Sequence, residues 1–296
     1  MTIAAAPTTP AKFRDYLDLT KPRLSLLSVL TALVGYLATR PPSNPTKLFF
    51  VLLATSLAAG GVAALNQWLE SDTDAQMQRT ADRPIPSGKI ASGSAFVVGA
   101  LMCIASLFLL FAKVNLPACL FTLLTIFAYL GWYTPAKRWS IWSTEIGALA
   151  GAFPPLIGWA AGEGRVTTLG WILFGILFFW QIPHFMAIAW IYRRDYSVVH
   201  FPMLPVRDEA GGKAAAWSLF NTFALVAVSL LPVYLGFASW AYGLAAAIGG
   251  AWFVWSAIVF LRADGRDVAA RKLFRCSLAY LPLVLGALVA DRMTNF

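Results

Sequence analysis

The sequence has few charged residues and very few histidines and cysteines. Of its 296 residues, 12% are charged and 59% are hydrophobic, whereas soluble domains carry about 25% charged residues. This scarcity of charge excludes an ordinary soluble domain. Cys103, Cys119 and Cys276 stand singly in or beside apolar stretches, which excludes a disulfide framework and a thiolate metal site. We interpret the three cysteines as packing residues.

Long apolar runs dominate what is present. Read between charged residues and Pro or Gly, they predict nine membrane-spanning helices, each near the about 20 residues that cross a bilayer. The ranges are 23–40, 47–68, 90–112, 115–134, 142–161, 167–191, 214–236, 238–261 and 273–290. Because the runs lack the alternation of barrel strands, the predicted fold is all-α. One polytopic domain is expected over residues 1–296, with 1–15 as a flexible cytoplasmic tail.

The Lys and Arg residues are unevenly divided between the loops. With the N-terminus placed in the cytoplasm, 18 of the 23 fall in cytoplasmic segments and 5 in the others. Basic residues accumulate on that side of membrane proteins, so the division supports both the orientation and the helix count. The net charge of +9 is therefore interpreted as a topology signal, and nucleic acid is not expected as a partner.

The opening stretch 1–10 is small and polar, with no apolar core that precedes a cleavage site. We therefore expect the first span to be retained as an anchor. The stretch also lacks the Arg- and Ser-rich composition of organelle transit peptides, which favours a bacterial inner membrane. The lipid bilayer is thus an expected partner, and the candidate chemistry described below falls on its cytoplasmic side.

Acidic residues cluster in two predicted cytoplasmic loops, where orientation does not require them. In the first, Asn66, Glu70 and Asp74 recur every four residues, which places them on one face of a helix. Like charges at this spacing repel each other, so a bound cation would make the arrangement favourable. Mg²⁺ typically binds one or two carboxylates together with phosphate oxygens of a substrate. The segment therefore predicts a magnesium site.

Basic residues suited to phosphate follow this segment. Arg79 and Arg83 repeat the four-residue spacing, and guanidinium groups bind phosphate oxygens through two parallel hydrogen bonds. Lys137 and Arg138 lie in the loop between the fourth and fifth predicted helices. The alternative interpretation is a solvated loop for the first segment, with Lys137 and Arg138 serving orientation alone.

The sixth predicted helix contains polar residues at membrane depth. Gln181 and His184 share one face, and polar groups at this depth are candidates for function. Pro183 removes a backbone hydrogen bond beside them. Asp195 follows near the membrane surface as a second source of carboxylate. A structural hydrogen bond within the bundle is the alternative for His184, and His200 is interpreted as a surface residue.

Together these segments resemble the UbiA superfamily of intramembrane prenyltransferases, over nearly all nine predicted helices. The matching pieces are 19–23, 66–83, 133–138, 151–159, 180–185, 195–196 and 202–205. Trp-Gln-Ile-Pro-His-Phe at 180–185 stands where other members place a second Asp pair, and resembles the branch that farnesylates heme. The chain departs from the family at Glu70, where Asp is usual, and at Ser143, where Asn is common.

The resemblance implies transfer of a farnesyl group from farnesyl diphosphate to a vinyl group of protoheme IX (heme B), with addition of water, to give heme O. It implies Mg²⁺ as cofactor, and a downstream heme A synthase or terminal oxidase assembly as partner. The implied roles are metal binding by Glu70, Asp72 and Asp74; catalysis by Asn66, Glu70, Asp74, His184 and Asp195; diphosphate binding by Arg79, Arg83, Lys137 and Arg138; and heme contact by Gln181, His184 and Tyr196.

Several alternatives stay open at this stage. His184 is compatible with ligation of heme iron, with contact near the propionates, and with proton transfer. A prenyltransferase for a quinone precursor or other aromatic acceptor would keep the fold and change the acceptor. A transporter or heme-handling protein without catalysis is the rival from another class. Charged residues deep within several spans would favour transport, whereas here they gather in two loops.

Overall fold

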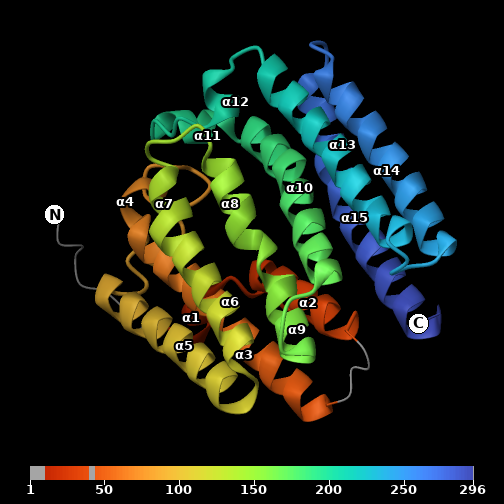
Figure 1. Ribbon diagram of the computed structural model, residues 1–296. Helices are drawn as coiled ribbons and strands as arrows, with labels where there is room; N and C mark the ends of the chain where they lie inside the picture. Colours follow the sequence, from red (N-terminus) through yellow and green to blue (C-terminus); the bar gives the residue numbers. More distant parts are fainter. Residues whose placement is uncertain (1–10, 40–43, 296) are drawn as a thin grey trace.

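The structure is a computed structural model that describes residues 11–39 and 44–295, and the elements in these ranges are all helical. This confirms the predicted all-α fold for the described part of the chain (Figure 1). The long continuous helices are α3 (Pro45–Leu69), α5 (Ser92–Lys113), α10 (Thr168–Ile191), α13 (Gly212–Tyr234), α14 (Trp240–Leu261) and α15 (Arg266–Asn295).

Two other rods are built from shorter pieces. α6 (Leu116–Phe127) continues through a π-helical segment, η1 (Ala128–Tyr133), into α7 (Thr134–Ala136). The next rod is divided at Phe153 into α8 and α9, because Pro154 and Pro155 have no N–H to continue the hydrogen-bond pattern. The remaining bounds are α1 (Phe13–Thr20), α2 (Pro22–Leu37), α4 (Ser71–Asp74), α8 (Ser143–Ala152), α9 (Pro154–Glu163), α11 (Arg193–Val198) and α12 (Leu204–Arg207).

Seven of the nine predicted spans coincide with helices that are long and apolar enough to cross a membrane. The range 23–40 corresponds to α2, an apolar helix of 16 residues, and the range 142–161 corresponds to α8 and α9, of 10 residues each. Residues 1–10 of the predicted tail lie outside the described residues, and α1 begins at Phe13. The protein is a multi-pass membrane protein.

Helices α2 and α9 pack backbone against backbone. A Cβ at Gly158 would collide with the carbonyl oxygen of Ala32, and a Cβ at Gly35 would collide with the carbonyl oxygen of Pro155. Glycine at both positions permits this close approach. The contact joins the N-terminal helices to the middle of the bundle.

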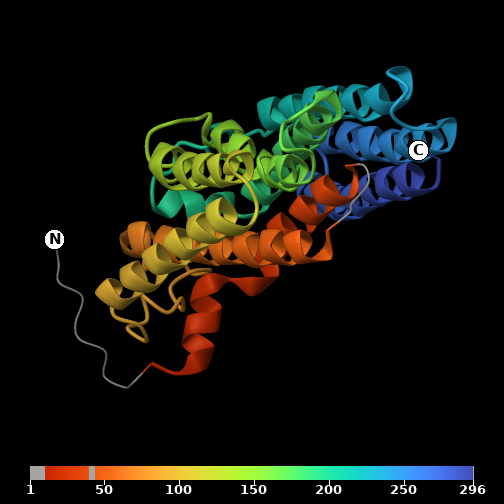
Figure 2. The same cartoon turned by 60° about the horizontal axis from the view of Figure 1, so that its bottom comes forward.

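Buried polar groups link the C-terminal helices to one another. Tyr280 Oη donates to Ser229 Oγ at 2.9 Å, and Tyr242 Oη donates to the Ser229 carbonyl at 2.7 Å. Trp180 Nε1 donates to the carbonyl of Ser277 at 2.8 Å. These bonds join α13 to α15, α14 to α13 and α10 to α15. Figures 1 and 2 show α13–α15 as a group on the opposite side of the bundle from α3 and α5.

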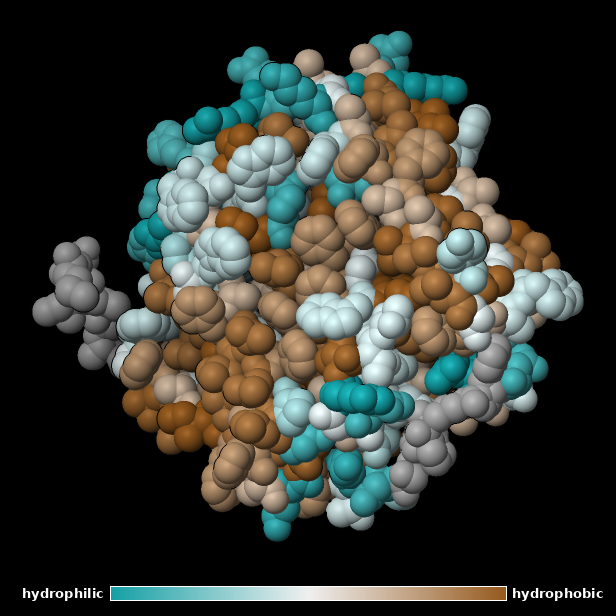
Figure 3. Space-filling view, viewed as in Figure 1, coloured by the Kyte–Doolittle hydropathy of each residue, from teal (hydrophilic) through white to brown (hydrophobic). Residues whose placement is uncertain are grey.

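Apolar side chains cover the middle of the face shown in Figure 3, and hydrophilic side chains gather toward its upper and lower ends. A bundle surrounded by lipid requires such a surface. Helices α4, α7, α11 and α12 lie at the upper end in Figure 1. The segments that carry most of the predicted charged site residues therefore meet at one end of the bundle.

Candidate active site

A cavity of about 520 Å³ lies at the end of the bundle where these segments meet, within the usual range of about 300–1,000 Å³ for small-molecule sites. Its charged and amide lining residues are Lys21, Asn66, Glu70, Asp74, Arg79, Arg83, Lys137, Arg271 and Arg275, and its aromatic lining residues are Tyr129, Tyr133, Phe185, Tyr192, Tyr196, Phe201 and Phe274. Seven predicted site residues are thus brought together, and they come from helices far apart in the sequence.

The predicted acidic face forms where α3 passes into α4. Glu70 N donates to the Asn66 carbonyl at 3.0 Å, and Asp74 N donates to the Glu70 carbonyl at 2.8 Å. These i to i−4 bonds keep the helical stacking across the junction. Asn66, Glu70 and Asp74 are all buried, and all three line the cavity. Asn66 Nδ2 also donates to Thr134 Oγ1 at 3.1 Å, which fixes the amide against α7.

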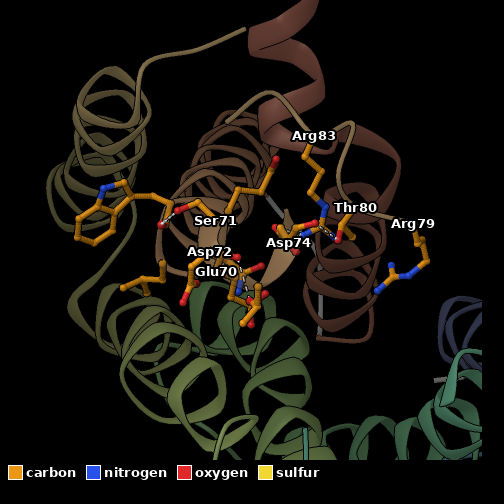
Figure 4. A network of polar contacts seen from close by, with 12 residues as sticks. Glu70, Ser71, Asp72, Asp74, Arg79, Thr80 and Arg83 are labelled. Atoms are coloured by element: carbon orange, nitrogen blue, oxygen red, sulfur yellow. Dashed lines mark hydrogen bonds and ion pairs between the residues drawn. The ribbon is translucent and has the colours of Figure 1, made fainter. Parts of the chain in front are cut away.

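Each cavity carboxylate has a basic partner. Lys137 Nζ lies 2.7 Å from Glu70 Oε1, and Arg83 Nη1 lies 2.5 Å from Asp74 Oδ2 (Figure 4). Burial alone would lower the pKa of Lys137, but the Glu70 carboxylate and nearby tyrosines together outweigh it and the pKa is raised. Burial raises the pKa of Asp74, although Arg83 opposes the shift. Two anions and two cations are therefore held together at the cavity wall.

Asp74 has capacity for a further ligand. Its Oδ1 is buried and has no hydrogen-bond partner, and a buried oxygen in this state is costly unless a ligand satisfies it. The described residues include no group of three or more His, Cys, Asp or Glu side chains placed to hold a metal ion. Two cavity carboxylates, one of them with an unpartnered oxygen, suit a Mg²⁺ ion that takes its other ligands from water and substrate phosphate.

Two predicted site residues pair with each other outside the cavity. Arg138 donates to both carboxylate oxygens of Asp72, at 2.6 and 2.9 Å. The two side chains are 43% and 58% exposed, and neither lines the cavity. The structure thus separates Asp72 from Glu70 and Asp74, and Arg138 from Lys137.

Lys21 is a cavity residue that the sequence reasoning did not assign. It joins α1 to α2 in the left-handed conformation, at φ 46°, and this turns the chain so that the side chain lines the cavity. Burial, with the nearby charges of Arg83 and Lys137, lowers its pKa to about 7. The Leu-Thr-Lys-Pro-Arg piece was the available signal, but no charge spacing connects it to Glu70 or Asp74.

Arg79 lies against two aromatic rings, one at the junction of α10 and α11 and one on α11. Its guanidinium carbon is 5.1 Å from the ring centroid of Tyr192 and 5.7 Å from that of Tyr196. These contacts orient the charge without neutralising it. Tyr196 lines the cavity as predicted, whereas its neighbour Asp195 is half-buried on α11 and is not among the lining residues.

Gln181 and His184 lie behind the cavity wall. Gln181 Nε2 donates to the carbonyls of Leu177 and Ala148, at 3.0 and 3.3 Å, so this amide joins α10 to α8. The His184 ring stacks on Trp180 and lies 5.1 Å, centroid to centroid, from Phe274. Phe274 lines the cavity, so its ring separates His184 from the cavity interior.

Arg271 and Arg275 of α15 also line the cavity, and the sequence reasoning counted them only as topology signals. Their four-residue spacing repeats that of Arg79 and Arg83 and was an available signal. The spacing was not used because Arg266 and Lys272 lie at the same end of α15, where the sequence predicts basic residues for orientation alone.

A second, smaller cavity adjoins the first. It has a volume of about 150 Å³ and shares Lys21, Leu24 and Tyr129 with the larger cavity. Small and apolar residues form most of its remaining lining, among them Ala58, Ala59, Val62, Ala63, Ala150 and Ile157. A cavity with many charged lining residues thus lies beside a smaller and mostly apolar one.

Comparison with known proteins places this arrangement in a family. The profile of the UbiA prenyltransferase family matches residues 28–278. A protein of Opitutus terrae named protoheme IX farnesyltransferase is 71% identical over 98% of this chain and 99% of its own. One of the same name from Solibacter usitatus is 40% identical over 94% of this chain and 99% of its own.

Solved structures show the same fold at low identity. A structure of digeranylgeranylglyceryl phosphate synthase has a TM-score of 0.80 at 19% identity, and covers 95% of this chain and 98% of that one. A UbiA homologue from Archaeoglobus fulgidus, bound to GPP and Mg²⁺, has a TM-score of 0.69 at 16% identity, over 93% and 99% of the two chains. The chain therefore belongs to the UbiA prenyltransferase family, within its protoheme IX farnesyltransferase branch.

Proposed function

We propose that this protein transfers the farnesyl group of farnesyl diphosphate to a vinyl group of protoheme IX. The C1 carbon of the farnesyl group bonds to the terminal vinyl carbon, and diphosphate leaves with the electrons of the broken C–O bond. The oxygen of water bonds to the other vinyl carbon and a proton is released, which gives heme O. The observation that carries the proposal is a cavity lined by charged residues beside an apolar cavity, in a chain 71% identical to a protoheme IX farnesyltransferase.

Glu70 and Asp74 are the proposed Mg²⁺ ligands, with Asn66 beside them. The ion would supply positive charge to the diphosphate. The buried, unpartnered Oδ1 of Asp74 supports this assignment. Asp72, proposed from the sequence as a third ligand, is less suited because both of its oxygens accept hydrogen bonds from Arg138.

The basic wall of the cavity is the proposed diphosphate site. Lys21, Arg79, Arg83 and Lys137 all line it, and Arg83 and Lys137 are held by the carboxylates of Asp74 and Glu70. Preorganised cations stabilise charge that develops on a leaving group without having to reorient during the reaction. Arg138 is occupied by Asp72 at the surface, so its predicted contact with diphosphate is the weakest of the set.

The apolar cavity is the proposed site of the prenyl chain. It meets the polar cavity at Lys21, so a diphosphate held by the basic wall would direct its hydrocarbon tail between α2, α3 and α6. Tyr129 lines both cavities, and the Tyr133 ring lies 5.0 Å from it, centroid to centroid. Both rings would help to exclude water from the reacting carbon.

His184, with Phe274 in front of it, is proposed to act on the acceptor side. Gln181, Tyr196 and Asp195 remain proposed acceptor-side residues, of which Tyr196 alone lines the cavity. We further propose one domain of nine passes with a cytoplasmic N-terminus, in a bacterial inner membrane, and an active site on the cytoplasmic side. A downstream heme A synthase or terminal oxidase assembly is the proposed consumer of the product.

The acceptor is tested with purified protein in detergent, Mg²⁺ and labelled farnesyl diphosphate. Protoheme IX and a quinone precursor are supplied separately, and products are identified by mass spectrometry. The proposal predicts farnesylated heme and no labelled quinone. Label in the quinone alone would establish the rival acceptor, and no transfer to either acceptor would support a non-catalytic role.

A further inference from the structure

Two arginines on one helix line the cavity without an acidic partner. Arg271 and Arg275 lie one turn apart on α15 and both are exposed to the cavity side of the bundle. Within residues 11–39 and 44–295, neither forms an ion pair or a side-chain hydrogen bond. Phe274, between them in sequence, lines the same cavity.

Several other basic groups near this end of the bundle already have partners within the chain. Arg83 and Lys137 pair with carboxylates, and Arg79 stacks on tyrosine rings. Arg266, at the start of α15, is buried and donates to the carbonyls of Phe260 and Leu261. Arg271 and Arg275 are therefore the cavity guanidinium groups best placed to receive an anion from outside the chain.

We propose that Arg271 and Arg275 bind the two carboxylates of the acceptor. The inference rests on the proposed function, because protoheme IX carries two propionate groups. A guanidinium group binds a carboxylate through two parallel hydrogen bonds, and such charge-assisted bonds are the strong ones. Two arginines one turn apart match two carboxylates attached to neighbouring pyrroles.

The position of the arginines agrees with the chemistry of the reaction. In protoheme IX the vinyl groups and the propionates are attached to opposite edges of the macrocycle. Glu70 and Asp74 come from the α3–α4 side of the cavity, whereas α15 lies on the other side of the bundle (Figures 1 and 2). Carboxylates held on α15 would thus direct the vinyl edge toward the proposed diphosphate site.

Phe274 and His184 complete this wall. Phe274, one residue before Arg275 on α15, lines the same cavity and offers a flat apolar surface to a macrocycle. His184 packs behind it, with ring centroids 5.1 Å apart. The subsite therefore combines two anion-binding groups with an aromatic face, a combination that a prenyl diphosphate does not require.

The competing explanation is that these arginines serve membrane orientation alone. Lys272 provides the matched control, because it is a basic residue of the same helix turn, is exposed and does not line the cavity. If the basic residues serve orientation alone, substitution of any of the three should have the same effect on activity. If they form a carboxylate subsite, only substitution of the two cavity residues should weaken acceptor binding.

The test compares the parent, the Arg271→Ala/Arg275→Ala variant and Lys272→Ala, with protoheme IX and with its dimethyl ester as acceptors. For the double variant we expect the KM for protoheme IX to rise about tenfold or more and the KM for farnesyl diphosphate to stay unchanged. With the dimethyl ester the parent and the double variant should have equal KM values. Lys272→Ala should match the parent throughout.

A titration of each detergent-purified protein with protoheme IX, followed by its Soret absorbance, gives a readout that does not need turnover. The Kd should rise about tenfold or more in the double variant and stay unchanged in Lys272→Ala. Equal Kd values for parent and double variant would overturn the carboxylate subsite. So would a double variant whose KM for the dimethyl ester rises as much as its KM for protoheme IX. A parent that binds protoheme IX but makes no farnesylated product would instead refute the proposed function, and the titration would still decide the subsite.

Discussion

His184 Nδ1 lies 2.7 Å from Ser277 Oγ, across the interface between α10 and α15. Ser277 Oγ itself donates to the Phe274 carbonyl at 2.6 Å, and a hydroxyl has one proton to give. While Ser277 makes that bond, a neutral His184 ring donates from Nδ1 and leaves Nε2 unprotonated. Ser277 thus fixes the tautomer of a residue that the proposed function places on the acceptor side.

Replacement of Ser277 by alanine should lower kcat several-fold, up to about tenfold, because the ring loses the acceptor that fixes its tautomer and orientation. The KM for farnesyl diphosphate should not change. Ser218→Ala is the matched control, since Ser218 is also fully buried but bonds only to the carbonyl of Ala214 in its own helix. Steady-state kinetics on both variants checks the prediction, and equal effects would contradict it.

Asp74→Asn should reduce turnover about a hundredfold or more, because a neutral amide is a poor ligand for a hard divalent cation. Asp72→Asn should retain most activity, since Asp72 pairs with Arg138 outside the cavity. The two variants make the same chemical change two residues apart. Turnover measured over a range of Mg²⁺ concentrations compares them, and an equal loss in both would restore the three-carboxylate site.

Lys137→Met should destabilise the protein by about 3–5 kcal/mol, because it leaves the buried Glu70 carboxylate without its partner. The double variant Glu70→Gln/Lys137→Met should regain most of that stability and remain inactive, since both proposed functional charges are gone. Thermal unfolding in detergent, together with turnover, checks both parts. A double variant as unstable as Lys137→Met would show that the pair is not coupled.

Gly158→Ala should lower the stability by about 1–3 kcal/mol, because the added methyl group meets the α2 backbone. Gly286→Ala on α15 is the control, as a Cβ there meets nothing within 4 Å. It should be neutral or slightly stabilising, since alanine favours a helix over glycine. The unfolding temperatures of the two variants in detergent should therefore move in opposite directions or by clearly different amounts.

The helical fold could be read from the sequence because apolar length alone predicts a spanning helix. Seven predicted ranges coincide with long helices, and the break between α8 and α9 occurs at Pro154 and Pro155, although the range 142–161 was predicted as one helix. Sequence spacing also predicted the common face of Asn66, Glu70 and Asp74, since one helical hydrogen-bond pattern runs through them.

The rest of the site depends on contacts between distant helices. The sequence spacing did not predict the pairing of Asp72 with Arg138. That contact forms because the segment after α7 lies beside α4 in the fold. Lys21 reaches the cavity through a left-handed turn, and Arg271 reaches it from the last helix. Local periodicity carries no information on contacts between residues distant in the sequence. These cavity residues were therefore identified only from the structure.

The hemes of a bacterial host that lacks heme O decide whether this chain makes heme O, when the host expresses the parent or its Glu70→Ala/Asp74→Ala variant. Extracted hemes are separated by chromatography and identified by mass spectrometry, with the amount of protein in the membrane measured in parallel. We predict heme O with the parent and only heme B with the variant. A parent present in the membrane without heme O, or heme O with both proteins, would contradict the account.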